Sequence, residues 1–156
     1  MRPETKIVLP VFAAVPLVML AATVGCTWAI AHGASMAWRS AFILFCHGIP
    51  SRCLTLWNVP MPICARCVAI YTGLFTGLIS FFALPALHER VMRMVLYAAA
   101  TPLAIDGITQ ALRLRESTNG LRIATGMAVG LSLGWWIMSA MERRQSPREV
   151  VRFTIP

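Results

Sequence analysis

Four long apolar runs divide the chain, and short polar segments separate them. The first two runs, Ile7–Ala31 and Val68–Leu87, contain no charged residue over 25 and 20 positions, and the third contains only Asp106. About 20 apolar residues are enough for a helix to cross a bilayer, and lipid offers the backbone no hydrogen-bond partners of its own. The runs lack the alternating pattern that is typical of membrane barrel strands. The pattern therefore predicts an all-α, four-helix transmembrane bundle, with helices near residues 7–31, 64–87, 91–112 and 121–141.

The longest connection between the predicted helices is the loop at residues 33–63. Within this loop, Met36–Cys46 is apolar but too short to cross a bilayer. We therefore expect a short re-entrant or interfacial helix in the first outer loop. Because there is no internal repeat and the length suits one domain, we expect residues 1–156 to form a single integral membrane domain.

The composition agrees with a lipid environment and argues against nucleic acid as a partner. Hydrophobic residues make up 58% of the chain and charged residues only 13%, whereas soluble domains carry about 25% charged residues. The formal net charge is +8. The arginines stand singly between the apolar runs, and they do not form the cluster that nucleic-acid-binding proteins present. The sequence predicts contact with the lipid bilayer and no nucleic acid as a partner.

The basic residues also predict an orientation. Four spans place both ends of the chain and the turn at residues 88–93 on one side, with eight basic residues against six on the other side. Cytoplasmic segments of membrane proteins carry the excess of Lys and Arg. We expect a protein of the bacterial or archaeal cell (inner) membrane, with both termini in the cytoplasm and the 33–63 loop outside.

Glycines recur at four-residue spacing in two of the predicted helices. Gly73 and Gly77 share one helix face, and so do Gly126, Gly130 and Gly134. Small residues at this spacing let membrane helices approach closely. These Gly-rich faces are predicted either to pack within the chain or to bind other membrane subunits.

Four cysteines and one histidine lie within 22 residues of one another. Cys64 and Cys67 form a C-x-x-C pair at the start of a predicted helix, where the thiolate form is favoured. Such a pair is the usual half-site for tetrahedral zinc, and a second half-site completes it. The same pair can instead be a redox dithiol, with Cys46 and Cys53 as a shuttle pair, or the cysteines can simply be buried apolar residues. The candidate metal ligands are Cys46, His47, Cys53, Cys64 and Cys67.

Polar residues inside the third and fourth predicted helices are the other anomaly. Asp106 lies well inside an apolar segment, where a charge is costly and needs a partner or a proton. Asp106, Gln110 and Arg113 are spaced to share one helix face. The four-helix topology brings this end of the third helix to the same side as the cysteines, so we expect one common site. Arg52 and Arg66 flank the cysteines and can hold an anion, stabilise thiolates or extend to the interface. The candidates for a polar site are Arg52, Arg66, Asp106, Gln110, Asn119, Arg122 and Thr125.

Four ordered blocks of the sequence resemble the prokaryotic integral membrane proteins grouped as domain of unknown function 2085. The family pattern reads C-H-x-x-P-x-R-S, P-x-C-x-R-C-x-G-x-Y-x-G, P-x-x-x-D-G-x-x-Q and S-x-N-x-x-R-x-x-T-G. Cys53 stands where the family has Ser, and Ala69 stands where Gly is common. The resemblance implies a shared membrane fold and polar site without an activity, and it favours Cys46, His47, Cys64 and Cys67 over Cys53. The matching residues are Cys46, His47, Pro50, Arg52, Pro62, Cys64, Arg66, Cys67, Tyr71, Gly73, Pro102, Asp106, Gly107, Gln110, Ser117, Asn119, Arg122, Thr125 and Gly126.

Three functions remain open on the sequence alone. The first is a binding or assembly role in which a metal, zinc for this ligand set, links the first outer loop to the second helix. The second is a membrane thiol–disulfide oxidoreductase using Cys64 and Cys67. The third is an accessory subunit of a larger membrane complex. The chain has no phosphate-cradling loop, nucleophile motif or H-E-x-x-H sequence, so no enzyme class is predicted.

Overall fold

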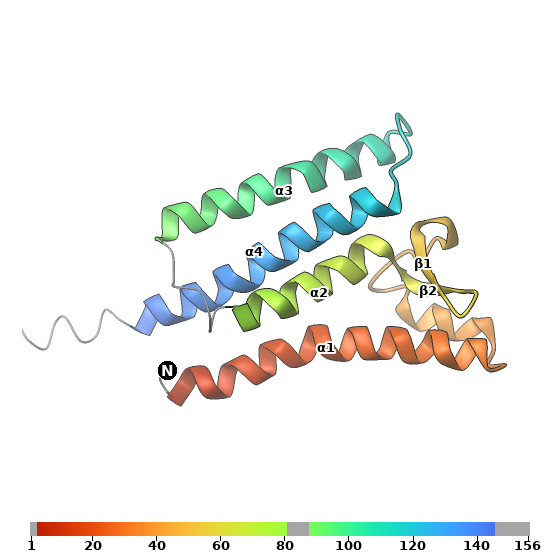
Figure 1. The fold of residues 1–156 in the computed structure, drawn as a ribbon, viewed down its shortest axis with the longest axis horizontal. Helices are drawn as coiled ribbons and strands as arrows, with labels where there is room; N and C mark the ends of the chain where they lie inside the picture. Colours follow the sequence, from red (N-terminus) through yellow and green to blue (C-terminus); the bar gives the residue numbers. More distant parts are fainter. Residues whose placement is uncertain (1–2, 81–87, 146–156) are drawn as a thin grey trace, which may run out of the picture.

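Four helices lie side by side in the computed structural model, which describes residues 3–80 and 88–145 (Figure 1). They are α1 (Pro3–Ala31), α2 (Ala65–Ser80), α3 (Glu89–Ala111) and α4 (Asn119–Gln145). Three of them, α1, α3 and α4, are long and apolar enough to cross a membrane, and α2 is a shorter apolar helix. The predicted all-α transmembrane bundle is confirmed. The last part of the predicted second helix, residues 81–87, lies outside the described residues.

The 33–63 loop folds at the end of the bundle opposite the N-terminus (Figure 1). The predicted short helix is present as a 3-10 helix, η1 (Met36–Phe42), which ends before Cys46. A second 3-10 turn, η2 (Pro50–Arg52), leads into an antiparallel hairpin of β1 (Cys53–Leu56) and β2 (Val59–Cys64). The hairpin delivers the chain directly into α2. It therefore fixes the position of the C-x-x-C pair at the first turn of that helix.

The hairpin was not predicted, and its turn explains why. Trp57 and Asn58 connect the strands with φ of 50° and 62°, the left-handed pair that two-residue hairpin turns require. Asn adopts this left-handed conformation readily, whereas Trp adopts it rarely. The second strand carries Pro60 and Pro62, which argue against a strand because proline cannot donate to a ladder. A two-stranded sheet has only edges, so both prolines are tolerated.

The helices α2 and α4 pack through their glycines. A Cβ on Gly73 would lie 2.6 Å from the carbonyl oxygen of Met127, and one on Gly126 would lie 2.7 Å from that of Arg66. The prediction of close helix approach is confirmed. Because the two glycine faces cover each other inside the chain, they are not the surfaces on which another subunit would dock.

Gly130→Ala is expected to destabilise the bundle. The added methyl group would run into the backbone of α2 at Ile70 and Leu74, with the Leu74 nitrogen 2.8 Å away. Forcing extra volume into a packed contact costs about 1–3 kcal/mol. Thermal unfolding in detergent measures the loss. Gly25→Ala in α1 is the matched control, because nothing lies within 4 Å of its added Cβ; equal melting temperatures for the two variants would contradict the packing.

Candidate functional site

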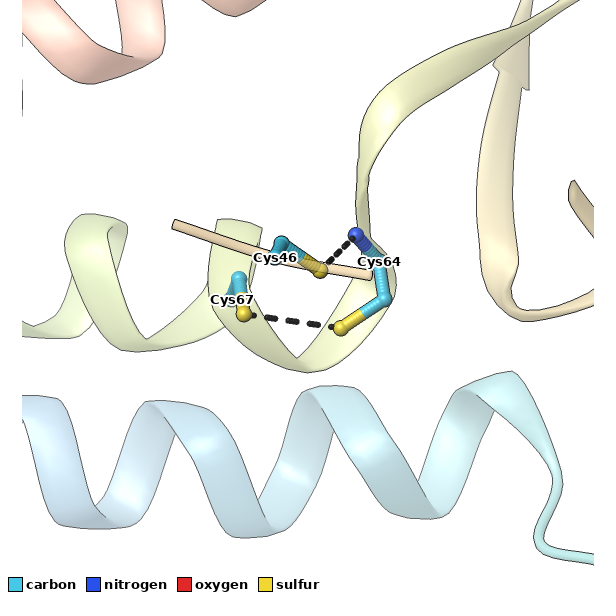
Figure 2. A group of neighbouring side chains, drawn as sticks. All are labelled: Cys46, Cys64 and Cys67. Carbon is cyan, nitrogen blue, oxygen red and sulfur yellow. Dashed lines mark hydrogen bonds between the residues drawn. The ribbon is translucent and has the colours of Figure 1, made fainter. Parts of the chain in front are cut away.

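Three cysteine sulfurs meet where the hairpin enters α2 (Figure 2). Cys64 ends β2, Cys67 lies in the first turn of α2, and Cys46 comes from the segment after η1. All three Sγ atoms lie within 4.8 Å of one another. Cys64 Sγ and Cys67 Sγ are 3.5 Å apart, and the Cys64 backbone N–H donates to Cys46 Sγ at 3.2 Å. Tetrahedral zinc with Zn–S bonds near 2.3 Å would hold its sulfurs about 3.8 Å apart, so this group could hold a metal ion.

The surroundings of Cys64 favour its thiolate. The hydrogen bond from Cys67 lowers the pKa of the Cys64 thiol to about 5, against the opposing effect of burial, and backbone N–H groups add to the lowering. Hydrogen bonds to the charged form favour that form. Thiolate is the state needed both for metal coordination and for disulfide exchange. Cys64 is therefore prepared for either chemistry.

Cys53 and His47 lie outside the group of three sulfurs. Cys53 is the register partner of Cys64 in the hairpin, but its thiol donates to the Ile49 carbonyl oxygen at 3.2 Å. Burial raises the pKa of Cys53 to about 11, so its thiol stays protonated. His47 is exposed and lines the cavity beside the sulfurs.

Asp106 is the centre of a polar network that joins three helices. Its carboxylate is 3% exposed and pairs with Arg66 of α2. Gln110, one turn further along α3, donates to Asp106 Oδ2 at 2.8 Å, and Arg115 reaches Asp106 Oδ1 at 3.3 Å. The buried carboxylate was expected to need one charged partner, and it has two, Arg66 and Arg115. The pairing ties the start of α2 to the end of α3.

Arg122 extends the network to α4 and to the hairpin. Its guanidinium donates to Gln110 Oε1 at 3.1 Å and to Asn119 Oδ1 at 2.8 Å. The Asn119 amide in turn donates to the Cys53 carbonyl oxygen at 3.5 Å. Thr125 is buried one turn along, but its hydroxyl donates to the Leu121 carbonyl oxygen of its own helix. Thr125 therefore packs beside the network without joining it.

Two details of the polar site differ from the sequence expectation. Helix α3 ends at Ala111, and Arg113 lies beyond it with φ of 56° and an exposed side chain. Its predicted place on the face of Asp106 is therefore wrong. Arg115 takes that role, because the left-handed turn reverses the chain and brings it back. Helical spacing cannot detect a contact made after a helix has ended.

Arg39 is a further residue that the sequence did not single out. Its guanidinium donates to the carbonyl oxygens of Gly48 and Met61 at 2.9 and 3.1 Å. These bonds hold the segment that carries Cys46 against strand β2. A single arginine in a loop gives no sequence signal of such a role.

A cavity of about 360 Å³ joins the sulfur cluster to the polar network. The predicted convergence of distant segments at one end of the bundle is therefore present in the fold. Among the residues that line the cavity are Cys46, His47, Arg52, Cys64, Arg66, Cys67, Gln110 and Arg122.

Comparison with known proteins gives the family. A family model described as "Predicted membrane protein (DUF2085)" matches residues 46–136, more than half of the chain. The chain belongs to this family. The DUF2085 segment begins at Cys46 and includes the three sulfurs and the whole Asp106 network.

Two relatives support the assignment to DUF2085. The chain is 35% identical over 106 residues to an uncharacterized protein of Methanocaldococcus jannaschii, covering 67% of this chain and 68% of the relative. It is also 35% identical over 92 residues to an uncharacterized protein of Methanothermobacter thermautotrophicus, covering 59% of this chain and 83% of the relative. No solved structure matches the chain.

Proposed function

We propose that this membrane protein binds zinc through the thiolates of Cys46, Cys64 and Cys67, in a binding or assembly role. The observation that carries the proposal is the mutual approach of three sulfurs within 4.8 Å. They come from two segments 18 positions apart in sequence, so local helix geometry alone does not explain the meeting. The zinc ion ties the first outer loop to the start of α2.

The donor set suits zinc better than harder cations. Thiolates select zinc and other soft or borderline metals, while calcium and magnesium take oxygen ligands. The N–H bond from Cys64 to Cys46 Sγ supports a negative sulfur. Structural zinc has four protein ligands, whereas sites with three keep an open position. The fourth zinc ligand in this proposal is either His47, which lines the same cavity, or a small molecule bound there.

Metal analysis of the purified protein tests this proposal directly. We expect about one zinc per chain, with loss of most of it in Cys64→Ser. Cys26→Ser is the control, because Cys26 is buried in α1 and lies outside the group of three sulfurs. Folded wild-type protein that holds no zinc when purified, and takes up none when zinc is supplied, would overturn the proposal.

A thiol–disulfide oxidoreductase is the second candidate, and the lowered pKa of Cys64 favours it. In that reaction the Cys64 thiolate attacks a partner disulfide, and Cys67 then resolves the mixed disulfide. The two thiols become one disulfide while the partner disulfide becomes two thiols. The nearby third sulfur of Cys46 favours metal binding instead. Thiol counting after exposure to a dithiol–disulfide buffer distinguishes the two, because a zinc site protects all three sulfurs.

We propose that both termini face the cytoplasm, which places the sulfur cluster on the outer side of the membrane. The excess of basic residues at the terminal side supports this orientation. A Thr55→Cys variant tests it, because Thr55 is exposed at the hairpin. In a background lacking the native cysteines, an impermeant thiol reagent should label intact cells. Labelling that requires lysed cells would contradict the orientation.

A further inference from the structure

The cavity beside the sulfur cluster has an excess of positive charge. Three arginines line the cavity: Arg52, Arg66 and Arg122. A fourth, Arg115, pairs with Asp106, which also pairs with Arg66 of the cavity wall. In the described part of the chain, Asp106 is the one carboxylate paired with these arginines. Four guanidinium groups against one carboxylate leave three positive charges. Zinc with three thiolates would carry one negative charge, so two positive charges would still remain.

The excess of positive charge is clearest at Arg122. Its side chain is deep in the bundle, at 5% exposed, and its partners Gln110 and Asn119 are neutral amides. Its Nε is buried and has no hydrogen-bond partner among the described residues, and the same holds for Arg66 Nε. Arg52 and Arg66 line the same cavity as Arg122, so the charged side chains beside it there include two of like sign. A buried charge without a counter-ion is strongly unfavourable, so this arrangement calls for an anion.

The shape of the cavity and its donors indicate the class of anion. A volume of about 360 Å³ lies at the small end of ligand pockets. Planar guanidinium groups match the oxygen pairs of phosphate and carboxylate. An excess of two or three positive charges suits a divalent anion better than a carboxylate with one charge. Apolar groups of Phe45 and Ile49 also line the cavity, which leaves room for an organic substituent.

We propose that this cavity binds a phosphate-class anion, either a free phosphate ester or the headgroup of an anionic lipid, held by Arg52, Arg66 and Arg122. The anion neutralises the arginine excess between α2, α3 and α4. It also lies beside the three sulfurs, where one of its oxygens is available to the open position of a bound metal. Only this last point rests on the zinc proposal, because the arginines attract an anion with or without a metal.

Binding measurements on the full chain test the anion site. Inorganic phosphate is titrated into detergent-solubilised protein by calorimetry, once as purified and once after chelation of metal. In a second arm, protein is incorporated into nanodiscs of phosphatidylcholine with or without phosphatidic acid, and its thermal unfolding is compared. Phosphate binding identifies a free anion, and stabilisation by phosphatidic acid alone identifies a lipid headgroup.

Arg52→Gln is the main variant, because Arg52 is half-buried and its side chain makes no hydrogen bond to the described residues. Its backbone N–H bond to the Ile49 carbonyl oxygen is kept in the variant. Loss of one charged contact is expected to weaken binding about tenfold or more. Arg113→Gln is the matched control, since Arg113 is exposed and lies outside the cavity. Wild-type affinity in Arg52→Gln, binding of acetate as tight as phosphate, or failure of both arms would overturn the proposal. Phosphate binding by folded protein that holds no zinc as purified, and takes up none when zinc is supplied, would overturn the zinc proposal alone.

Discussion

Asp106→Asn is expected to lower the free energy of unfolding by about 3 kcal/mol. The substitution keeps the shape of the side chain but removes the charge that Arg66 and Arg115 share. Removing one partner of a buried ion pair leaves an uncompensated charge, which costs about 3–5 kcal/mol. We take the lower end because the side chains of Arg66 and Arg115 are 22% and 53% exposed and keep contact with water or headgroups.

Thermal unfolding in mild detergent is the measurement for this variant. For a domain of this size, about 3 kcal/mol corresponds to a fall of about 6–12 °C in melting temperature. Glu89→Gln is the matched control. Glu89 pairs with Arg93 at 3.7 Å on α3, but both side chains are more than half exposed, so this pair contributes about 0–1 kcal/mol. Similar melting temperatures for both variants would show that Asp106 does not hold the helices together.

The helical part of the fold follows from simple solvent physics. Long uncharged runs must form helices in lipid, so four helices could be predicted at their approximate bounds. The glycine spacing likewise predicted faces that allow close helix approach, because only a small residue lets two backbones come so near. That these two faces pack on each other, α2 against α4, comes from the structure. These patterns do not predict the conformation of the 33–63 loop. The hairpin depends on the left-handed turn at Trp57 and Asn58. The prolines that follow in the second strand argue against a strand, so the sequence gives no hairpin signal.

The site could be predicted as a region but not as a set of contacts. Topology alone places the start of α2, the end of α3 and the start of α4 at one end of the bundle, which predicts that their polar residues lie close together. Which of them pair, such as Arg66 with Asp106 and Arg122 with Gln110, comes from the structure. The choice among the cysteines does not follow from spacing. Cys46 joins Cys64 because the backbone N–H of Cys64 reaches its sulfur, while Cys53 turns to the Ile49 carbonyl oxygen. Which cysteine lies beside Cys64 depends on the conformation of the loop. Loop conformation leaves no periodic pattern in the sequence from which it could be predicted.

Removal of zinc by a strong chelator is expected to loosen the 33–63 loop while the helices stay folded. The hairpin has only two short strands, and an isolated hairpin is marginally stable in water. Strand β2 packs on α1 with Met61 and Ile63 buried. The polar ties of the rest of the loop are the three sulfurs, the bonds from Arg39 within the loop and the amide of Asn119. At a zinc concentration about 1,000 times its dissociation constant, binding contributes about 4 kcal/mol, which the chelator removes.

Hydrogen exchange read by mass spectrometry locates this effect. We expect faster exchange in peptides covering residues 46–67 after chelation, and little change in α3, where the metal has no ligand among the described residues. Cys53→Ser is the control that keeps the metal, because serine can also donate to the Ile49 carbonyl oxygen that Cys53 contacts. A chelated Cys53→Ser protein should thus loosen like chelated wild type, whereas Cys46→Ser should show fast exchange before any chelator is added. Equal exchange in all these samples would mean that the packing of β2 on α1 and the Arg39 and Asn119 bonds are enough to hold the loop. The three sulfurs would then contribute nothing to its order.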